Sequence, residues 1–457
     1  MSFSSWYNRS LNRIWGFVED RTGMRKWALR PQPEFTFKPS YWTGAFVAVA
    51  FIYQILSGML LLLYYEPSVS ITTTACGSGT AIAPAASCST YFIMHSVPMG
   101  TLLITTHLYG AYAMIFLMLV HFYRGYYLGV YKKPREFSWM VGALLLVVTL
   151  GMGFTGYLLP YTALSYDATD VGINLALSLQ IPLPGGAVLN MGALVAPFLL
   201  GNGTPQGLIS RMFWAHVLLL PLLLGALLYA HIALFESHGI APPATSDPTQ
   251  RRRFTEKEDR HHVPFVPHIL WYMIKWGLLY LGMLFAIAAL WPWYLLSWYG
   301  NTAAPLPPII PDWYFLWLFK LLDFQGVTPL IAVTVGTVLL LYILFLPFLD
   351  RSKRTHPRDS PVFVYIGTCL IEVIIIMSVW GELTPGVAIL PTGVLETLGP
   401  TFLVNAVVIT ALHLRYRASY KRRLAAARAG RYAGIYSTTT PGAATPVPTA
   451  TEVTSLE

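Results

Sequence analysis

Charged residues are scarce in this sequence. Only 11% of its 457 residues are Asp, Glu, Lys or Arg, whereas 55% are hydrophobic and the mean hydropathy is positive. This composition excludes an ordinary soluble enzyme and indicates a chain that crosses a lipid bilayer many times. The formal net charge of +9 does not indicate nucleic-acid binding, because the basic residues lie in short segments that flank apolar stretches.

Cysteine is also rare, and no C-x-x-C pair occurs among the three cysteines. The chain therefore lacks the usual ligand sets for zinc and for iron–sulfur clusters. Cys369 lies in an apolar stretch, whereas Cys76 and Cys88 share one polar loop. If that loop faces an oxidising compartment the two can form a disulfide, although their spacing is also compatible with two free thiols.

The first residues lack the short apolar core and the small-residue cleavage site of a signal peptide. Residues 1–30 instead carry aromatic and basic side chains at roughly helical spacing. This pattern predicts an amphipathic helix on the cytoplasmic membrane surface, with a disordered basic arm as the alternative.

Long apolar stretches dominate the rest of the chain. Eight of them reach the roughly 20 residues that a helix needs to cross the hydrocarbon core. We therefore predict an all-α, polytopic membrane protein with eight transmembrane helices. The stretches cover approximately 42–65, 98–122, 138–160, 211–235, 268–298, 328–349, 362–381 and 396–414.

Basic residues are missing from alternate loops. The loops at 66–97, 161–210 and 382–395 contain no Lys or Arg, whereas 27 of the 30 basic residues lie in the terminal segments and in the loops after spans two, four and six. Positively charged loops stay on the cytoplasmic side, and an even number of spans places both termini on one side. Both termini are therefore predicted to be cytoplasmic, and the neutral loops to face outward.

Two pairs of histidines stand out within the apolar stretches. His107 and His121 are 14 residues apart in the second stretch, and His216 and His231 are 15 apart in the fourth. On an α-helix these intervals span about 21 and 22 Å and return to within about 40° and 60° of one face. Both stretches run from outside to inside, so His107 should face His216 and His121 should face His231. Facing neutral imidazoles can hold an iron axially, although any one of them could be only a polar contact between helices.

Glycines repeat at the same interval on the neighbouring stretches. Gly44 and Gly58 lie 14 residues apart in the first, and Gly142 and Gly156 lie 14 apart in the third. Glycine has no Cβ and lets helix backbones come close to a flat cofactor. Its other common use in membrane helices is simple helix packing, but the repeated interval favours cofactor binding.

These histidines and glycines, with the sequence Pro311-Asp312-Trp313-Tyr314, resemble cytochrome b of the quinol-oxidising bc complexes. The resemblance covers about residues 35–415 and is prokaryotic in type. It implies a four-helix haem-binding bundle followed by four further helices, in the plasma membrane. It divides the chain into a cytoplasmic N-terminal segment (1–41), a di-haem bundle (42–236), a cytoplasmic linker (237–267), a C-terminal part with the quinol site (268–416) and a basic then disordered tail (417–457).

The resemblance implies two haem b groups. His107 and His216 would hold the low-potential haem near the outer face, and His121 and His231 the high-potential haem near the cytoplasm. Arg124 matches an arginine that pairs with a haem propionate in the family.

The outer haem departs from the family pattern in one respect. Ile104 stands where family members often have an arginine. Arg211, which matches another family arginine, is therefore a candidate partner for the propionates of the outer haem.

Other departures concern the type of cytochrome b. The 15-residue interval between His216 and His231, and Pro221, are typical of the chloroplast type, yet that type is split into two chains and this sequence is continuous. The chloroplast type also attaches a third haem through a cysteine, which would fall near Trp42. No cysteine is present there, so the sequence predicts two haems and not three.

A proline-rich loop between spans five and six leads into a segment that begins PDWYFLW. The resemblance places quinol oxidation here, with Asp312 and Tyr314 as catalytic residues and residues 153–161 as the other wall. A carboxylate beside a quinol can accept one of its protons. The alternative for Asp312 is that it is only the N-cap of a helix. The family usually has glutamate at this position, and the aspartate points to a low-potential quinol such as a menaquinol.

The inner quinone site has a weaker signal. Several polar residues flank the linker between spans four and five, and among them we single out His238. Most of the histidines there, including His261, His262 and His268, are expected to be ordinary interfacial residues. Met273 stands where the family has an aspartate, and Lys275 is nearby.

The resemblance implies a subunit that oxidises quinol near the outer face and couples this to proton translocation. One electron would pass through the two stacked haems to a quinone-reducing site near the cytoplasm. The other would pass to a Rieske iron–sulfur partner and on to a c-type cytochrome, another high-potential acceptor or an oxidase. A homodimer is expected from the family.

Two other classes fit parts of the pattern. A di-haem membrane anchor of a quinone-linked dehydrogenase also uses histidines in helices, but typically has four or five spans and no PDWY loop. A non-redox transporter could use intramembrane histidines to move protons.

Overall fold

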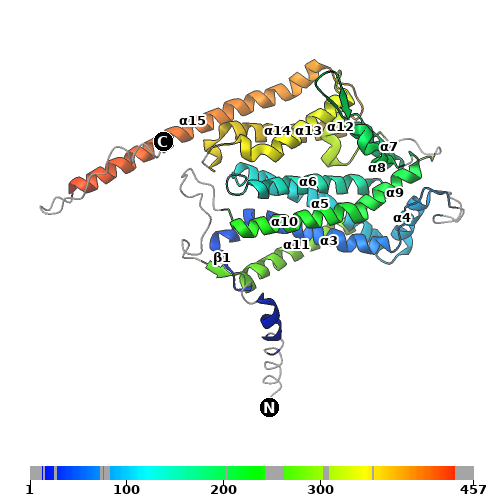
Figure 1. Cartoon of the computed structure of the whole chain (residues 1–457), viewed down its shortest axis with the longest axis horizontal. Helices are drawn as coiled ribbons and strands as arrows, with labels where there is room; N and C mark the ends of the chain where they lie inside the picture. Colours follow the sequence, from blue (N-terminus) through cyan, green and yellow to red (C-terminus); the bar gives the residue numbers. More distant parts are fainter. Residues whose placement is uncertain are drawn as a thin grey trace, which may run out of the picture.

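The fold is almost entirely helical, as Figure 1 shows. This computed structural model describes residues 13, 16–24, 28–72, 76, 83–201, 203–241, 262–301, 308–352 and 355–437. Within them, eight helices are long and apolar enough to span a bilayer, which confirms the predicted all-α class and the number of spans. They are Thr43–Leu62 (α3), Gly100–Tyr127 (α5), Glu136–Tyr157 (α6), Pro205–His238 (α9 to α10), Phe265–Leu290 (η5 and α11), Pro329–Leu349 (α13), Pro361–Leu383 (α14) and Pro391–Arg422 (within α15).

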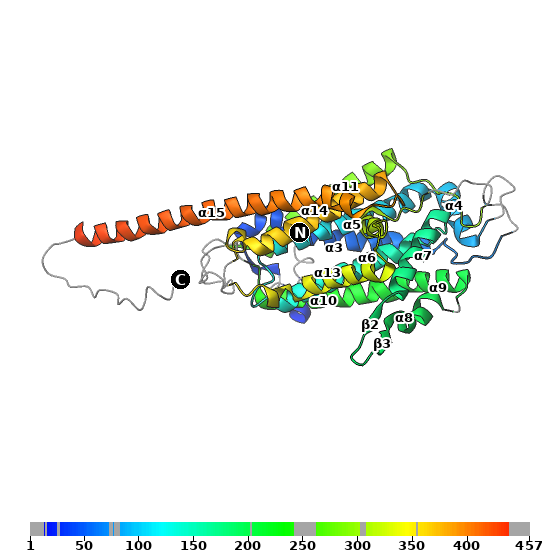
Figure 2. The same ribbon diagram turned by 90° about the horizontal axis from the view of Figure 1, so that it is seen from above.

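The first four spans form one bundle. α3 packs on α5, α5 on α6 and α6 on α10, and the helices run side by side in both views (Figure 1 and Figure 2). An apolar layer fills the middle of this bundle, and polar side chains are left to the levels above and below it. The layer consists of Ala50, Phe51, Met114, Met118, Leu145, Leu146, Val148 and Leu224.

The fourth span contains a π-helical turn. It covers Ala215–Leu219, where α9 (Pro205–Trp214) meets α10 (Leu220–His238). Pro221 explains this turn, because proline has no N–H to donate and its ring clashes with the carbonyl four residues earlier. The hydrogen bond that closes the turn runs from the Leu220 N–H to a carbonyl oxygen five residues back, as in a π-helix.

The last four spans pack against this bundle. α11 (Leu270–Leu290) contacts α3 and α5, α13 contacts α6, and α14 contacts both α5 and α15 (Pro391–Ser437). Between spans five and six, the short helix α12 (Trp313–Leu322) packs on α13 and α14.

A buried lysine fixes the position of α12. The Lys320 side chain is only 1% exposed, and its ammonium donates to the Asp323 carboxylate at 2.8 Å and to the Thr384 carbonyl oxygen at 2.6 Å. A buried ammonium is stable only when its donors are satisfied in this way. These bonds hold α12 against the end of α14 and so position the residues at the start of α12.

The loops predicted to face outward contain structure that the sequence analysis missed. They carry α4 (Ala85–Ser96), α7 (Ala163–Leu177) and α8 (Met191–Leu200), and a hairpin of β2 (Gln180–Pro182) with β3 (Val188–Asn190). In Figure 1 these elements lie at one end of the molecule, near α9 and α12. They are short and mixed in composition, so a search for long apolar stretches does not find them.

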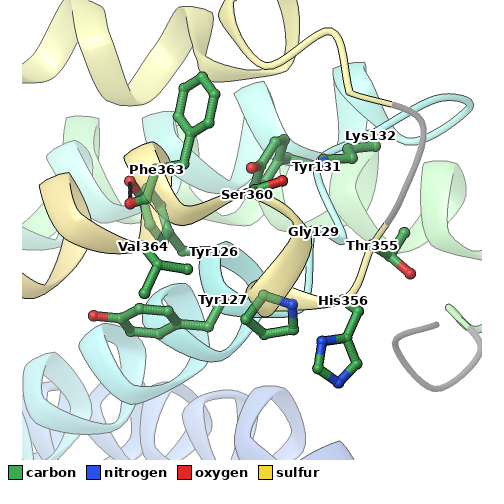
Figure 3. A pocket seen from close by; sticks show the side chains of 11 residues that line it. Tyr126, Tyr127, Gly129, Tyr131, Lys132, Thr355, His356, Ser360, Phe363 and Val364 are labelled. Carbon is green, nitrogen blue, oxygen red and sulfur yellow. Dashed lines mark hydrogen bonds between the residues drawn. The ribbon is translucent and has the colours of Figure 1, made fainter. Parts of the chain in front are cut away.

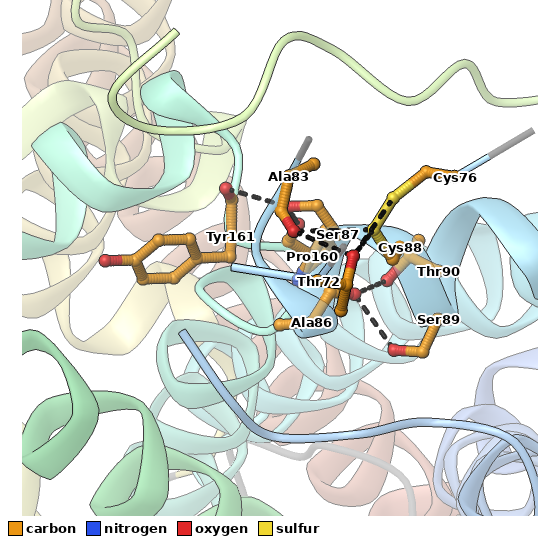
Figure 4. The surroundings of a disulfide bond; sticks show 10 residues. All are labelled: Thr72, Cys76, Ala83, Ala86, Ser87, Cys88, Ser89, Thr90, Pro160 and Tyr161. Carbon is orange, nitrogen blue, oxygen red and sulfur yellow. Dashed lines mark hydrogen bonds between the residues drawn. A yellow bond between two sulfur atoms is a disulfide. The ribbon is translucent and has the colours of Figure 1, made fainter. Parts of the chain in front are cut away.

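Cys76 and Cys88 form a disulfide at this end of the molecule (Figure 4). Of the two alternatives that their spacing allowed, the structure shows the bonded one. The bond ties the preceding loop to α4, and the Ser87 hydroxyl donates to the Pro160 carbonyl oxygen at 3.1 Å. This part of the loop is therefore anchored to the end of α6.

The opposite end of the bundle joins segments that are far apart in sequence. β1 (Pro31–Pro33) pairs antiparallel with β4 (His262–Pro264), and Arg30 forms an ion pair with Glu236. Residues 16–22 are helical, which agrees with the predicted N-terminal helix over that part. The rest of that predicted helix falls largely outside the described residues, and its place on a membrane surface stays a prediction.

The last helix is longer than the sequence analysis expected. α15 continues without a break from its membrane span through the basic segment to Ser437 (Figure 2). This segment is rich in Ala, Arg and Lys, which are strong helix formers. Any disordered tail therefore begins later than the predicted start near Tyr432. Residues 438–457 lie outside the described part of the chain.

Candidate functional site

Two layers of facing histidines lie inside the four-helix bundle. In the outer layer, the ring centroids of His107 and His216 are 6.4 Å apart and the ring planes are 78° to each other. In the inner layer, His121 and His231 are close enough to interact electrostatically. The apolar middle of the bundle separates the two layers. Spans two and four therefore run parallel, as the sequence analysis predicted.

The π turn explains how unequal intervals produce matching layers. The interval between His216 and His231 is one residue longer than that between His107 and His121. A π turn accommodates one extra residue within a single turn. The 15-residue interval thus brings His231 opposite His121.

Each imidazole is hydrogen-bonded through Nδ1. The partners are Ser57 Oγ for His107 (2.8 Å), Thr43 Oγ1 for His121 (3.0 Å), the Met152 carbonyl oxygen for His216 (3.0 Å) and the Ser138 carbonyl oxygen for His231 (3.0 Å). A carbonyl oxygen only accepts, so His216 and His231 carry a proton on Nδ1. The Ser57 hydroxyl donates its proton to the Tyr53 carbonyl oxygen at 2.8 Å, so His107 is a donor too. In these three neutral rings Nε2 keeps its lone pair, which is the form that binds a metal.

A glycine faces each imidazole ring. A Cβ would meet the ring carbon Cε1 at 2.6 Å for Gly156 and His216, 3.0 Å for Gly44 and His121, and 3.3 Å for both Gly58 with His107 and Gly142 with His231. A real Cβ is essentially never found below 3.0 Å from another heavy atom. The repeated glycines therefore make room for the imidazole rings themselves. The sequence analysis expected them to make room for a flat cofactor.

The donor set fits iron in a macrocycle better than a bare metal ion. Each layer supplies two imidazoles, and the described residues contain no cluster of three or more His, Cys, Asp or Glu. A structural metal ion usually needs four protein ligands, whereas haem iron needs only axial ones. The centroid distance of 6.4 Å in the outer layer suits two imidazoles that bind one metal from opposite sides, with bonds of about 2.0 Å.

The two predicted propionate partners lie in different settings. Arg124 lies over the Tyr41 ring at 4.3 Å, near the inner layer, and its Nε is buried without a hydrogen-bond partner. A buried donor of this kind can be satisfied by an anionic group. Arg211 is exposed on α9 and packs against Gly201. Of the two arginines, only Arg124 therefore shows an unsatisfied donor beside a histidine layer.

Asp312 occupies the N-cap position of α12 but does not cap the helix. None of the α12 backbone N–H groups bonds to its side chain. Both carboxylate oxygens instead accept from phenols, with Tyr112 donating to Oδ1 at 2.6 Å and Tyr314 donating to Oδ2 at 2.9 Å. Burial raises the pKa of the Asp312 carboxyl above its ordinary value, and the two hydrogen bonds offset this only in part. A raised pKa makes this carboxylate a better proton acceptor.

The end of α6 forms the other wall of this site, as expected for residues 153–161. A Cβ at Gly153 would lie 2.6 Å from the Tyr314 hydroxyl oxygen, so glycine is needed for Tyr314 to reach Asp312. The Tyr157 hydroxyl donates to the Ile310 carbonyl oxygen at 3.2 Å, just before the PDWY sequence. Burial raises the pKa of Tyr314 well above its ordinary value, so this phenol stays a hydrogen-bond donor.

A small apolar pocket lies between α3 and α11, beside the inner layer. Trp42, Met273 and Trp276 contribute to its lining, and both indole N–H groups are buried without a hydrogen-bond partner. Trp42 directly precedes Thr43, whose hydroxyl bonds to His121. An apolar pocket with two unsatisfied donors suits a ligand that carries carbonyl oxygens.

The residue that the sequence analysis chose for the inner site, His238, does not line this pocket. Its Nδ1 bonds to the Leu234 carbonyl oxygen at 2.8 Å, and Arg135 donates to its carbonyl oxygen at 3.3 Å. The side chains of His261 and His262 lie outside the described residues. The two tryptophans were missed because the sequence does not reveal whether an indole N–H finds a partner.

A second pocket opens between the α5–α6 loop and the start of α14 (Figure 3). Beside it, the buried Lys132 ammonium lies 2.8 Å from the Asp350 carboxylate, to which the Tyr131 hydroxyl also donates at 2.6 Å. Burial favours the neutral form of Asp350, but these hydrogen bonds prevail and lower its pKa. The polar groups satisfy one another, so this cluster joins the two halves of the chain.

Comparison with known proteins identifies the family. The family profile "Cytochrome b(N-terminal)/b6/petB" matches residues 112–297, and the profile "Cytochrome b(C-terminal)/b6/petD" matches residues 299–398. The chain belongs to the cytochrome b family. It is 33% identical to the cytochrome b of Sulfolobus acidocaldarius over 413 residues, which make up 86% of this chain and 70% of that protein.

Two further relatives extend this comparison. A menaquinol:cytochrome c reductase cytochrome b subunit from Geobacillus thermodenitrificans is 34% identical over 244 residues, which cover 51% of this chain and 99% of that protein. Among solved structures, a chain of a hyperthermophilic respiratory complex III matches with a TM-score of 0.67 and 26% identity, over 87% of this chain and 96% of that chain.

Membership of the family confirms the resemblance seen in the sequence and implies that the protein binds haem b. The chain is a cytochrome b of the bc-type, complex III-like respiratory class. The N-terminal and the C-terminal family profiles both match this one chain. This result does not favour a dehydrogenase anchor or a transporter.

Proposed function

We propose that this chain is the di-haem subunit of a bc-type complex that oxidises quinol on one side of the membrane and reduces quinone on the other. His107 and His216 hold the low-potential haem b, and His121 and His231 hold the high-potential one. The observation that carries this proposal is the pair of stacked histidine layers, in which Nδ1 is hydrogen-bonded and a glycine faces every ring. Haem b, when bound, supplies a reversible one-electron couple between the two sides.

Quinol is oxidised beside Asp312 and Tyr314. A quinol hydroxyl that reaches the Asp312 carboxylate gives it a proton, and the pKa raised by burial favours this transfer. Tyr314 orients the carboxylate and keeps its own proton. The identity of residue 312 also favours one class of quinol. The family usually has glutamate at this position, and the aspartate of this chain suits a menaquinol-like substrate.

Quinone is reduced in the pocket between α3 and α11. The indole N–H groups of Trp42 and Trp276 donate to the carbonyl oxygens of the quinone. The apolar lining holds the ring, and the pocket borders the inner layer through Thr43.

The two sites lie on opposite sides of a prokaryotic plasma membrane. The distribution of basic residues supports a cytoplasmic position for both termini and for the inner layer. The disulfide between Cys76 and Cys88 supports an oxidising compartment at the other end. Quinol protons are therefore released outside and quinone protons are taken up inside, which translocates protons.

The partners follow from this chemistry. The sequence contains no iron–sulfur ligand set, so the second quinol electron passes to a Rieske iron–sulfur protein and then to a c-type cytochrome or an oxidase. The names of the relatives, a menaquinol:cytochrome c reductase subunit and a respiratory complex III, support this assignment. A homodimer embedded in lipid is the expected assembly.

The haem content of the purified native complex tests the proposal. We expect two b haems per chain, and His107→Ala should remove one of them and abolish quinol oxidation. His268→Ala is a matched control, because His268 is exposed and outside both layers. Full haem content in the His107→Ala protein would contradict the proposal. Identification of the co-purifying subunits tests the Rieske and cytochrome partners.

A further inference from the structure

Tyr112 links the quinol site to the helix that carries two of the four histidines. It lies on α5, five residues after His107, and its hydroxyl donates to Asp312 Oδ1 at 2.6 Å. The two residues are 200 positions apart in sequence. The bond is the shorter of the two that the carboxylate accepts, since Tyr314 donates to Oδ2 at 2.9 Å.

This contact changes where the Asp312 carboxylate lies. An aspartate at an N-cap position normally turns its side chain back to the first N–H groups of the helix. Asp312 makes no such bond and reaches across to α5 instead. Five residues of helix correspond to a rise of about 7.5 Å. The backbone of Tyr112 lies that far along α5 from His107, and its hydroxyl ties the carboxylate to this helix.

Three phenols face Asp312. Tyr112 comes from α5, Tyr157 from α6 and Tyr314 from α12, and each interacts with the carboxylate. The rings of Tyr112 and Tyr314 are 6.3 Å apart. Within the described part of the chain, the hydrogen bonds from Tyr112 and Tyr314 stabilise the charged form of Asp312, and no cation interacts with it.

We propose that Tyr112 is a positioning residue of the quinol site, which holds the Asp312 carboxylate inside the bundle and ready to accept a proton. This inference rests on the proposed quinol oxidation. In the step itself, the quinol O–H bond breaks, the proton binds a carboxylate oxygen of Asp312, and the bonding electrons stay on the quinol oxygen. The Tyr112 and Tyr314 protons remain on their phenols.

Removing the Tyr112 hydroxyl should change the pKa of Asp312 in a known direction. A hydrogen bond to a carboxylate stabilises its charged form and lowers its pKa. Without this bond the Asp312 pKa rises further, so a higher pH is needed to keep the carboxylate free to accept a proton. A hydrogen bond to a charged group corresponds to about one pKa unit.

The test is Tyr112→Phe in the purified complex, with quinol oxidation measured across pH. We expect the acidic limb of the rate profile to move up by about one pH unit, with unchanged haem content. Tyr109→Phe is the matched control, because its exposed hydroxyl on the same helix donates only to the Trp291 carbonyl oxygen at 2.9 Å. The control should keep the wild-type profile.

A second measurement separates this role from a general packing effect. In an Asp312→Asn background, Tyr112→Phe should not shift the pH profile, since the group whose pKa it tunes is absent. A wild-type pH profile in Tyr112→Phe, or an equal shift in the Asp312→Asn background, would overturn the assignment of Tyr112. Failure of the wild-type complex to oxidise quinol would instead refute the proposed function.

Discussion

The two histidine layers share one scaffold but differ in their surroundings. Each layer has a facing pair of imidazoles and two glycines. The outer layer lies beside the carboxylate and phenols around Asp312, whereas the inner layer has the Arg124 guanidinium nearby. A positive charge near a redox site favours its reduced form. The comparison therefore supports the proposed direction of electron transfer, from the outer layer to the inner one.

The quinone-facing ends differ in the same way. At the outer end, Asp312 can accept a proton, which suits the oxidation of a quinol. At the inner end, the N–H groups of Trp42 and Trp276 can only donate hydrogen bonds, which suits a quinone carbonyl. The chemistry of each end thus matches the direction of electron flow proposed for it.

The largest effect should come from the tightest glycine. A Cβ at Gly156 would lie 2.6 Å from His216, but one at Gly142 would lie 3.3 Å from His231. We expect Gly156→Ala to displace the His216 ring and lose the outer haem, with at least a tenfold loss of quinol oxidation. Gly142→Ala should keep both haems. Optical spectra of the two purified variants make the measurement, and equal effects would show that the layers are packed alike.

The next effect concerns the outer end alone. Asp312→Asn removes the proton acceptor but keeps the shape of the side chain. We expect quinol oxidation to fall by about 100-fold, as for loss of a general base, with both haems retained. Steady-state rates with a quinol substrate check this. An unchanged rate would mean that the proton leaves by another route.

A smaller change should appear at the inner layer. Arg124→Gln removes the positive charge beside His121. We expect the midpoint potential of the inner haem to fall by roughly 60 mV, which is a tenfold change for a one-electron couple. Redox titration measures it, and Arg211→Gln is the comparison, because Arg211 is exposed. If Arg211→Gln shifted the midpoint potential of the inner haem more than Arg124→Gln does, Arg124 would not be the charge that distinguishes the inner layer.

The smallest effect should follow from loss of one hydrogen bond to a ligand ring. Ser57→Ala removes the acceptor of the His107 Nδ1 proton and leaves a buried donor without a partner. We expect about 1–3 kcal/mol of lost stability, seen as earlier haem release on heating. Ser68→Ala in the outer loop, which contacts no histidine, is the control. Equal thermal release in both variants would argue against an orienting role for Ser57.

Much of the fold was predictable because its signals are local. Hydrophobic length determines the eight spans, and their basic flanks predict an orientation. The helical repeat relates His107 to His121 without any tertiary contact. The parallel course of spans two and four followed from these patterns, and the structure confirms it.

Other features depend on contacts between distant segments. The sequence left Asp312 open as an N-cap, and only its distance to Tyr112 shows where the carboxylate points. The unpaired indoles of Trp42 and Trp276 and the disulfide of Cys76 and Cys88 are of the same kind. The π turn next to Pro221 could have been suspected from the proline, but the alignment of His231 with His121 is visible only after folding.

The sequence by itself determined that the chain is a membrane bundle with two levels of paired histidines, because hydropathy and helical period act along one segment at a time. The tertiary structure alone decided which ring nitrogen is free, which glycine meets which ring and which phenol holds Asp312. These depend on hydrogen bonds and close contacts between residues up to 200 positions apart, and such pairings are decided by packing and not by local pattern.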